Sequence, residues 1–273
     1  MKPIIGYAAG VWCYKNFERS SLVQRRAIRY YLGVHRFAPN HAIEGDMGWT
    51  PSKVELYLEM FRLWNHLVTL PPDRITRKVF NWDFNLCSHN WASEICDVFT
   101  TCNCVDTFQY KNLCVIDDMQ SLLMNVESNN WDIARHNKDK LRTYNIFKCN
   151  YEPEEYVYLN LKRKVRSLIA QFRCGILPLQ IEVGRYRNVP VENRLCFSCT
   201  NKIEDEYHLL MECSVYDDLR SNMFNAIVRK DQNFLDLDVF DQFIEICSNF
   251  QIYLGKFLCY ATERRYNIIY DSL

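Results

Sequence analysis

The stretch Cys196-Phe-Ser-Cys199-Thr-Asn-Lys-Ile-Glu-Asp-Glu-Tyr-His208-Leu-Leu-Met-Glu-Cys213 places three cysteines and a histidine at the spacing of a metal site. Two thiolates separated by two residues can hold one ion from a single tight turn, and a histidine and a cysteine five positions apart can reach it from the start of a helix. Four such ligands satisfy a tetrahedral Zn²⁺ and leave no position for water. The stretch therefore predicts one closed, structural zinc site made of Cys196, Cys199, His208 and Cys213.

The spacing of all four residues carries this prediction, because a pair of cysteines alone would be weak. The chain has 13 cysteines among 273 residues, so about half a Cys-x-x-Cys pair is expected by chance. Requiring a histidine and a further cysteine at permitted distances lowers the chance expectation to about one or two in a hundred such chains. A structural zinc ion contributes on the order of 10 kcal/mol to the domain that binds it. We therefore expect the C-terminal region to depend on the metal.

A second group of possible ligands occurs earlier in the chain. It consists of Cys87, His89, Cys96, Cys102 and Cys104. These spacings fit no standard zinc pattern, so we expect ordinary buried or free thiols. A second metal site is the alternative.

Composition indicates a folded and mainly helical protein. Hydrophobic residues make up 48% of the chain and aromatic residues 14%, which is ample for a packed core. Glycine occurs only 8 times, which favours helices over turn-rich sheets. Apolar residues also recur at helical spacing through much of the chain. We predict a mainly α fold, with helical bundle-like segments and a small zinc-binding knuckle in the C-terminal half.

Local start and stop signals divide the chain into two helical regions. Helices are expected over 18–34, 51–67, 73–82 and 91–99, from near 117, and over 154–171, 215–229, 238–248 and 250–267. The polar stretch 103–111 is expected to be a loop. Residues 128–140 are rich in Asn, Asp and Lys, which is typical of a domain boundary. The predicted organisation is a helical region over 1–127, a linker over 128–150 and a helical zinc-binding domain over 151–273.

The distribution of charge is more informative than its sum, since Lys+Arg and Asp+Glu both number 33. Residues 162–194 hold two acidic residues and eight basic ones: Lys162, Arg163, Lys164, Arg166, Arg173, Arg185, Arg187 and Arg194. Aromatic residues lie among them, and such surfaces neutralise phosphates and stack on bases. We predict that these eight residues contact RNA or single-stranded DNA, and the alternative is a solvated helix face. Residues 1–36, which include Arg29 and Tyr30, form a second basic candidate.

The sequence contains no recognisable catalytic motif. There is no phosphate-binding glycine loop and no Gly-x-Ser-x-Gly turn. The paired carboxylates at 117–118 and 217–218 have no third carboxylate placed by sequence to complete a Mg²⁺ site. No secretory leader and no apolar run of about 18 residues are visible. We expect a protein that is not an enzyme, has no membrane contact, lies in the cytoplasm or nucleus and keeps its cysteines reduced.

Two sets of short motifs resemble a known family. The first set is Tyr7-Ala-Ala-Gly-Val-Trp12, Gln24-Arg-Arg-Ala-Ile-Arg29, Leu32-Gly-Val-His-Arg-Phe-Ala-Pro-Asn40 and Gly45-Asp-Met-Gly-Trp49. The second set is Gln171-Phe-Arg-Cys-Gly175, Leu177-Pro-Leu179, Glu182-Val-Gly-Arg-Tyr186, Arg194-Leu-Cys196 and Glu204-Asp-Glu-Tyr-His-Leu-Leu210 followed by Cys213. The first resembles the stretch that follows the polymerase core in reverse transcriptases of non-LTR retrotransposons. The second resembles the zinc-binding C-terminal end of the same proteins.

This resemblance implies a thumb- or connection-like helical region followed by a zinc-binding domain, which together grip RNA or DNA. The family's ligands correspond to the four residues named above. Its polymerase needs an aromatic-x-Asp-Asp turn, and the segments Val115-Ile-Asp-Asp118 and Val215-Tyr-Asp-Asp218 lack the aromatic residue. We therefore expect a non-catalytic, nucleic-acid-binding, zinc-stabilised terminal fragment of such a reverse transcriptase. The alternative is a structural or protein-interaction helical domain with a purely structural zinc, which packs on an upstream polymerase domain or on another protein.

Overall fold

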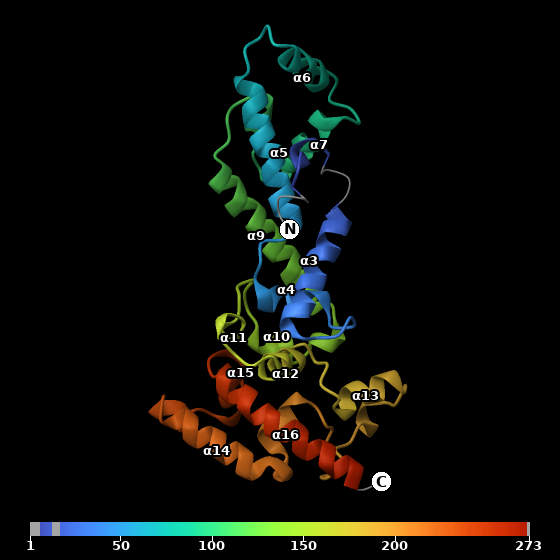
Figure 1. The fold of residues 1–273 in the computed structure, drawn as a ribbon, viewed down its shortest axis with the longest axis vertical. Coiled ribbons are helices and arrows are strands. Elements are labelled where there is room, and N and C mark those ends of the chain that lie inside the picture. Colours follow the sequence, from blue (N-terminus) through green and yellow to red (C-terminus); the bar gives the residue numbers. More distant parts are fainter. Residues whose placement is uncertain (1–5, 13–16, 272–273) are drawn as a thin grey trace. The chain divides into compact units, whose positions relative to one another are not determined.

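The computed structural model describes residues 6–12 and 17–271. These residues form helices joined by turns (Figure 1), and within them no β-strand occurs. Leu195 and Ile203 form an isolated antiparallel bridge. The structure thus confirms the predicted mainly helical fold. Over the same residues, no helix has both the length and the apolar character required to cross a membrane.

The chain divides into two compact units. The first unit contains Met1–Arg26 and Trp49–Trp131, and the second contains Ala27–Gly48 and Asp132–Leu273. This division differs from the predicted one in two ways. The segment Ala27–Gly48 belongs to the second unit rather than to the N-terminal region, and the expected linker 128–150 begins inside a helix, α9 (Ile116–His136). The division between Trp131 and Asp132 does fall within the polar stretch 128–140, but the backbone there is helical rather than an extended linker.

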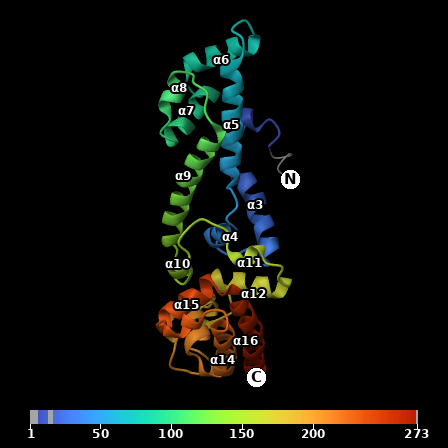
Figure 2. The same ribbon diagram turned by 90° about the vertical axis from the view of Figure 1, so that its left-hand side faces the viewer.

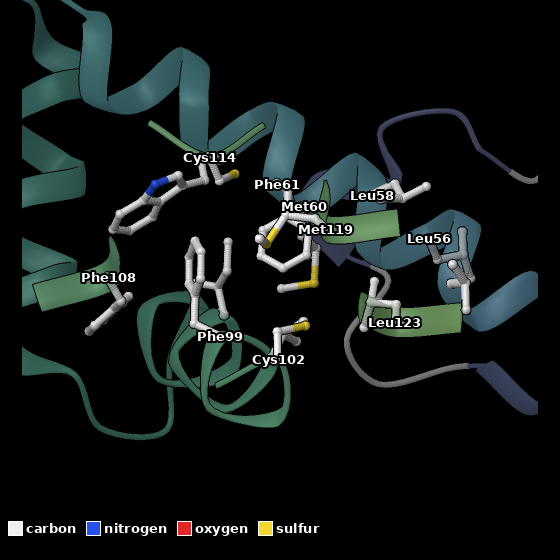
Figure 3. Packing of buried hydrophobic residues seen from close by; sticks show 14 of the residues in the cluster. Leu56, Leu58, Met60, Phe61, Phe99, Cys102, Phe108, Cys114, Met119 and Leu123 are labelled. Atoms are coloured by element: carbon white, nitrogen blue, oxygen red, sulfur yellow. The ribbon is translucent and has the colours of Figure 1, made fainter. Parts of the chain in front are cut away.

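The first unit is built around aromatic side chains. Its helices are α2 (Ala9–Trp12), the first part of α3 (Phe17–Leu32), α5 (Ser52–Thr69), α6 (Ile75–Leu86), α7 (Trp91–Thr101), α8 (Val105–Gln109) and the first part of α9. Phe61 of α5 meets Phe99 of α7 at a ring-centroid distance of 4.9 Å (Figure 3). Trp64 stacks on Phe108 at 5.3 Å. Edge-to-face and offset contacts of this kind add to the free energy gained by burying the rings.

Two local features explain the helices between residues 90 and 110. Asn90 begins α7, because its side chain accepts a hydrogen bond from the N–H of Ser93 and the Ser93 hydroxyl caps Asn90 in return. The predicted loop 103–111 is wrong, since it contains α8. The physical reason is Phe108, which is 6% exposed and anchors this short helix in the aromatic core.

The second unit holds most of the chain's helices. They are the second part of α3, α4 (Asn40–Met47), the end of α9, η2 (Asp139–Leu141), α10 (Tyr144–Phe147), α11 (Glu155–Tyr158), α12 (Arg163–Arg173), α13 (Gln180–Tyr186), η3 (Val191–Asn193), η4 (His208–Glu212), η5 (Ser214–Tyr216), α14 (Asp217–Val228), η6 (Gln232–Asp236), α15 (Val239–Ser248) and α16 (Gln251–Asp271). The long helix α16 packs against α12 and α14 (Figures 1 and 2). Gly255 permits close packing with α12, because a Cβ there would lie 2.6 Å from Cγ1 of Val165.

The single helix predicted over 154–171 is wrong, since residues 159–162 separate α11 from α12. Tyr156 explains the interruption. Its side chain is fully buried, its hydroxyl donates to Oδ2 of Asp46 at 2.8 Å, and its N–H donates to the side chain of Gln251 at 2.9 Å. These contacts fix α11 independently of α12.

A buried ion network joins the segment Ala27–Gly48 to the rest of the second unit. The Arg173 guanidinium donates two hydrogen bonds to Asp46, at 2.8 and 2.9 Å, and lies 2.9 Å from Glu154. Lys148 also donates to Glu154, at 2.6 Å. Burial alone would lower the pKa of Arg173, but Asp46 and Glu154 raise it well above its ordinary value. Arg173 therefore stays charged in the core and is paired on two sides.

Gly48 ends α4 in a left-handed conformation and at a position where a larger residue has no room. Its φ is +57°, its N–H donates to the carbonyl of Glu44, and a Cβ at this position would lie 2.2 Å from the nitrogen of Pro153. We expect Gly48→Ala to lower the free energy of unfolding by about 3 kcal/mol, through backbone strain and steric overlap. Urea denaturation followed by circular dichroism measures this change. Ser221→Ala, at an exposed position of α14, is the control and should leave stability unchanged.

Candidate metal centre

The four residues predicted as metal ligands come together in the second unit. One ligand atom from each of Cys196, Cys199, His208 and Cys213 lies within 4.8 Å of the others. The sulfur of Cys213 is 3.6 Å from that of Cys199 and 4.0 Å from that of Cys196. A tetrahedral ion with metal–sulfur bonds of ~2.3 Å requires sulfur atoms about 3.8 Å apart. The cluster can therefore hold one metal ion, as the spacing predicted.

The two N-terminal ligands lie on a tight turn after η3. The N–H of Cys196 donates to the carbonyl of Lys202 at 2.8 Å, and the N–H of Thr200 donates back to the carbonyl of Cys196 at 2.9 Å. Thr200 has a φ of +53°, which lets the chain reverse directly after Cys199. The turn thus holds both sulfurs on one side of the backbone.

The two C-terminal ligands lie at the ends of a single π-helical turn, η4. The N–H of Cys213 donates to the carbonyl of His208 at 2.8 Å, a bond between residues five apart. In an α-helix such residues would point roughly 140° apart around the axis. The wider π-turn brings them to the same side, and turns of this kind are common at functional sites.

His208 is oriented as a metal ligand would be. Its Nε2 atom is buried and, within the described part of the chain, makes no hydrogen bond. Its Nδ1 atom lies 3.2 Å from Oε2 of Glu212. Metal-binding histidines usually donate the hydrogen of their other ring nitrogen to a carboxylate, which fixes the ring and increases its basicity. The unsatisfied Nε2 and the Glu212 contact together fit the zinc ion predicted from the sequence.

The ionisation of the cluster makes metal binding depend on pH. Burial would raise the pKa of the Cys196 thiol, but His208 and the N–H groups of Cys199 and Ser198 lower it to about 7. The Cys196 sulfur raises the pKa of His208 to about 9. Burial raises the pKa of Cys213 to about 12, so this thiol must lose a proton when a metal binds. Affinity for the metal should consequently increase with pH.

Several supporting residues were missed by sequence reasoning. Arg220 donates to the carbonyls of Cys213 and Leu210 at 2.8 and 2.7 Å, and so fixes the chain at the last ligand. Glu204 accepts two hydrogen bonds of 2.7 Å from Arg265 of α16. Glu212 could have been identified from the sequence, because it follows His208 by four residues on what was expected to be a helix. Arg220 lies only seven residues after Cys213 but carries no recognisable pattern, and Arg265 lies 61 residues from Glu204.

The second cysteine group does not assemble in the same way. Cys87, Cys96, Cys102 and Cys104 are free thiols in the first unit. In the ranges covered by the structure, the cluster at 196–213 is the one place where three or more such side chains gather closely enough for a metal.

The eight basic residues predicted to contact nucleic acid do not form one surface. Lys162, Arg163 and Lys164 are exposed at the start of α12, and Arg187 is exposed after α13. Arg173 must be removed from the set, because its side chain is fully buried in the ion network described above.

The other three basic residues are partly engaged within the protein. Arg166 lies over the ring of Tyr31 at 4.3 Å. Arg185 pairs with Glu182 at 3.6 Å. Arg194 donates to the carbonyls of residues 189 and 181, at 2.9 and 2.8 Å. These three stabilise local structure, so the exposed residues of α12 are the stronger candidates for a ligand.

A groove in the second unit brings the two basic stretches of the sequence together. It has a volume of about 650 Å³ and is lined by Arg29, Tyr30, Gly33, Val34, His35, Arg163, Lys164 and Ser167. The Arg163 guanidinium lies 5.2 Å from the centre of the Tyr30 ring, and Tyr30 is 75% exposed. Burial and the nearby charge of Lys140 lower the pKa of His35. The groove therefore combines permanent positive charge with an accessible aromatic face.

Comparisons with known proteins give this chain no family. No protein-family model, curated protein or solved structure matches it.

Proposed function

We propose that this chain is a non-catalytic nucleic-acid-binding protein, stabilised by one zinc ion and derived from the C-terminal region of a non-LTR retrotransposon reverse transcriptase. One observation carries the proposal: the groove between residues 29–35 and 163–167 is lined by Arg163, Lys164 and Tyr30, and the exposed Tyr30 ring lies under the Arg163 guanidinium. The motif resemblance is consistent with this role.

Zinc is the metal that best suits the cluster. Three thiolates and one imidazole match the soft-to-borderline character of Zn²⁺ and its tetrahedral preference. Because all four positions are occupied by protein atoms, the ion has a structural role rather than a catalytic one. Its part in function is to hold the second unit, and with it the groove, in the folded state.

The groove suits a single strand of RNA or DNA. The exposed Arg163 and Lys164 side chains can neutralise phosphates, whereas Arg29 donates hydrogen bonds to the carbonyl of Ala38 and to the side chain of Asn40. No acidic residue is among those that line the groove in the described part of the chain. Each stacked base contributes about 1–3 kcal/mol on an aromatic ring. Duplex bases are already stacked on each other, so Tyr30 can add affinity only for unpaired bases. RNA or single-stranded DNA is thus the proposed partner.

The double substitution Arg163→Glu with Lys164→Glu tests this proposal. We expect the affinity for a single-stranded RNA oligonucleotide at low salt to fall by about tenfold or more, because two phosphate contacts become repulsive. The slope of log affinity against log salt should become shallower by about 0.7 for each lost contact. Fluorescence anisotropy measured over a series of salt concentrations gives both quantities.

The matched control is Arg229→Glu with Lys230→Glu, at exposed positions after α14. It changes the net charge by the same amount away from the groove, so it should bind RNA nearly as well as the parent. Equal binding by the parent and by the groove variant would contradict the proposed site. If the parent itself did not bind RNA, the alternative of a structural or protein-interaction domain with a purely structural zinc would be favoured.

A further inference from the structure

Helix α6 of the first unit presents a row of apolar side chains to solvent. This row, which we call the α6 stripe, consists of Ile75, Val79, Trp82 and Leu86, whose exposed fractions are 78%, 58%, 65% and 54%. The intervals of four, three and four residues place all of them within a sector of about 60° on a helix of 3.6 residues per turn. The same intervals separate the contact positions of helices that pack against other helices.

The opposite face of α6 is already covered by the core of the first unit. Phe80 is 3% exposed and meets Trp64 edge-to-face at 5.6 Å. Phe84 lies 4.7 Å from Phe108. A helix at the surface of a protein normally has one apolar side. Since α6 has two, its amino-acid pattern is that of a helix covered on both sides.

The size of the stripe is sufficient for a weak interface. A fully exposed tryptophan presents about 250 Å² and the smaller aliphatic side chains less, so the stripe exposes on the order of 500 Å², near the upper end for a monomer. Two copies that covered each other would bury about 1,000 Å², which is the lower limit for a specific interface. A dimer formed only through this helix should therefore be weak, with a dissociation constant of about micromolar order.

We propose that the α6 stripe is covered by a second copy of this chain, with the two α6 helices antiparallel. In this arrangement Ile75 of one copy lies opposite Leu86 of the other. Val79 likewise lies opposite Trp82, so a small side chain meets a large one at the centre of the contact. The pattern is self-complementary, as a twofold interface requires.

The polar residues beside the stripe favour the antiparallel arrangement. Lys78 and Asn85 lie on one flank, so Lys78 of each copy faces Asn85 of the other. Thr76 and Asp83 lie on the second flank and meet in the same way. The basic start of each helix, at Arg74 and Lys78, then lies beside the partially negative C-terminal end of the other helix. A parallel pair would instead bring the two basic ends together.

Sedimentation equilibrium of the full chain over a range of concentrations tests the proposal. We expect the parent protein to pass from monomer to dimer, and Trp82→Glu to remain monomeric because a charge replaces the largest side chain of the stripe. Ile133→Glu is the control, since Ile133 of α9 is 64% exposed but lies outside the stripe, and it should associate like the parent. Circular dichroism and the thermal midpoint of each variant verify that it folds.

A complementation experiment tests the direction of the helices. Ile75→Glu and Leu86→Lys should each weaken dimerisation when studied alone. Mixed together, they should form a heterodimer at least about tenfold tighter than either homodimer, because Glu at 75 then faces Lys at 86. A parent chain that stays monomeric, or a Trp82→Glu protein that dimerises normally, overturns the proposal. A mixture without rescue overturns the antiparallel arrangement.

Discussion

Replacing Cys199 by serine is expected to abolish metal binding and to unfold the second unit. A serine hydroxyl stays protonated at neutral pH and cannot replace a thiolate, and the remaining three ligands cannot complete a closed tetrahedral site. A structural zinc ion contributes on the order of 10 kcal/mol, which is comparable with the whole stability of an ordinary domain, about 5–15 kcal/mol. Elemental analysis should find one zinc per chain in the parent protein and none in Cys199→Ser.

The chain offers a direct way to separate unfolding of the second unit from general unfolding. All six tryptophans, at positions 12, 49, 64, 82, 91 and 131, belong to the first unit. Tryptophan fluorescence therefore follows the first unit, whereas far-ultraviolet circular dichroism follows the helices of both. For Cys199→Ser we expect a loss of helical signal with tryptophan emission that remains close to that of the parent.

The control for this substitution is Cys149→Ser, which removes an exposed free thiol from the same unit. It should retain one zinc per chain and the stability of the parent. Retention of zinc and of full helicity by Cys199→Ser would show that the four residues do not act together as a metal site. Addition of a strong chelator to the parent should reproduce the effect of Cys199→Ser.

The metal centre could be predicted from the sequence because its ligands lie in one short stretch. Residue spacing then determines which side chains can meet, with little help from the rest of the fold. The groove could not be predicted in this way. Tyr30 and Arg163 lie 133 positions apart in the sequence. Helical periodicity contains no information about which distant helix packs beside which. Both basic stretches were recognised from the sequence, but their proximity in the folded structure was not.

The burial of individual charged side chains could not be predicted from the sequence either. Arg173 follows other basic residues in the sequence and appeared to belong to the same exposed face. Its partner Asp46 lies 127 positions away, and Asp46 belongs to a segment that the sequence analysis placed in the N-terminal region. The same long-range contact explains why the division of the chain differs from the predicted one, since it ties Ala27–Gly48 to the second unit.

Replacing Arg173 by methionine is expected to lower the free energy of unfolding of the second unit by about 3–5 kcal/mol. Methionine has a similar length, so little space is left empty. Asp46, however, loses two hydrogen bonds, and among the described residues Glu154 keeps Lys148 as its one remaining cation. The carbonyl of Cys247 also loses a donor at 2.6 Å. Urea denaturation followed by circular dichroism measures the cost.

A double variant distinguishes two causes of this destabilisation: a buried carboxylate left without its cation, and the simple loss of contacts. If the cost comes from leaving the Asp46 carboxylate buried without its cation, then adding Asp46→Asn should recover part of the stability lost in Arg173→Met. The two effects would then be non-additive, as expected for residues in one network.

Arg187→Met, at an exposed arginine, is the control and should change stability by less than about 0.5 kcal/mol. An Arg173→Met protein as stable as this control would show that the buried network does not hold Ala27–Gly48 in place. If the single variant is unstable and the double variant regains nothing, the guanidinium acts through its packing and its bond to Cys247 rather than through charge.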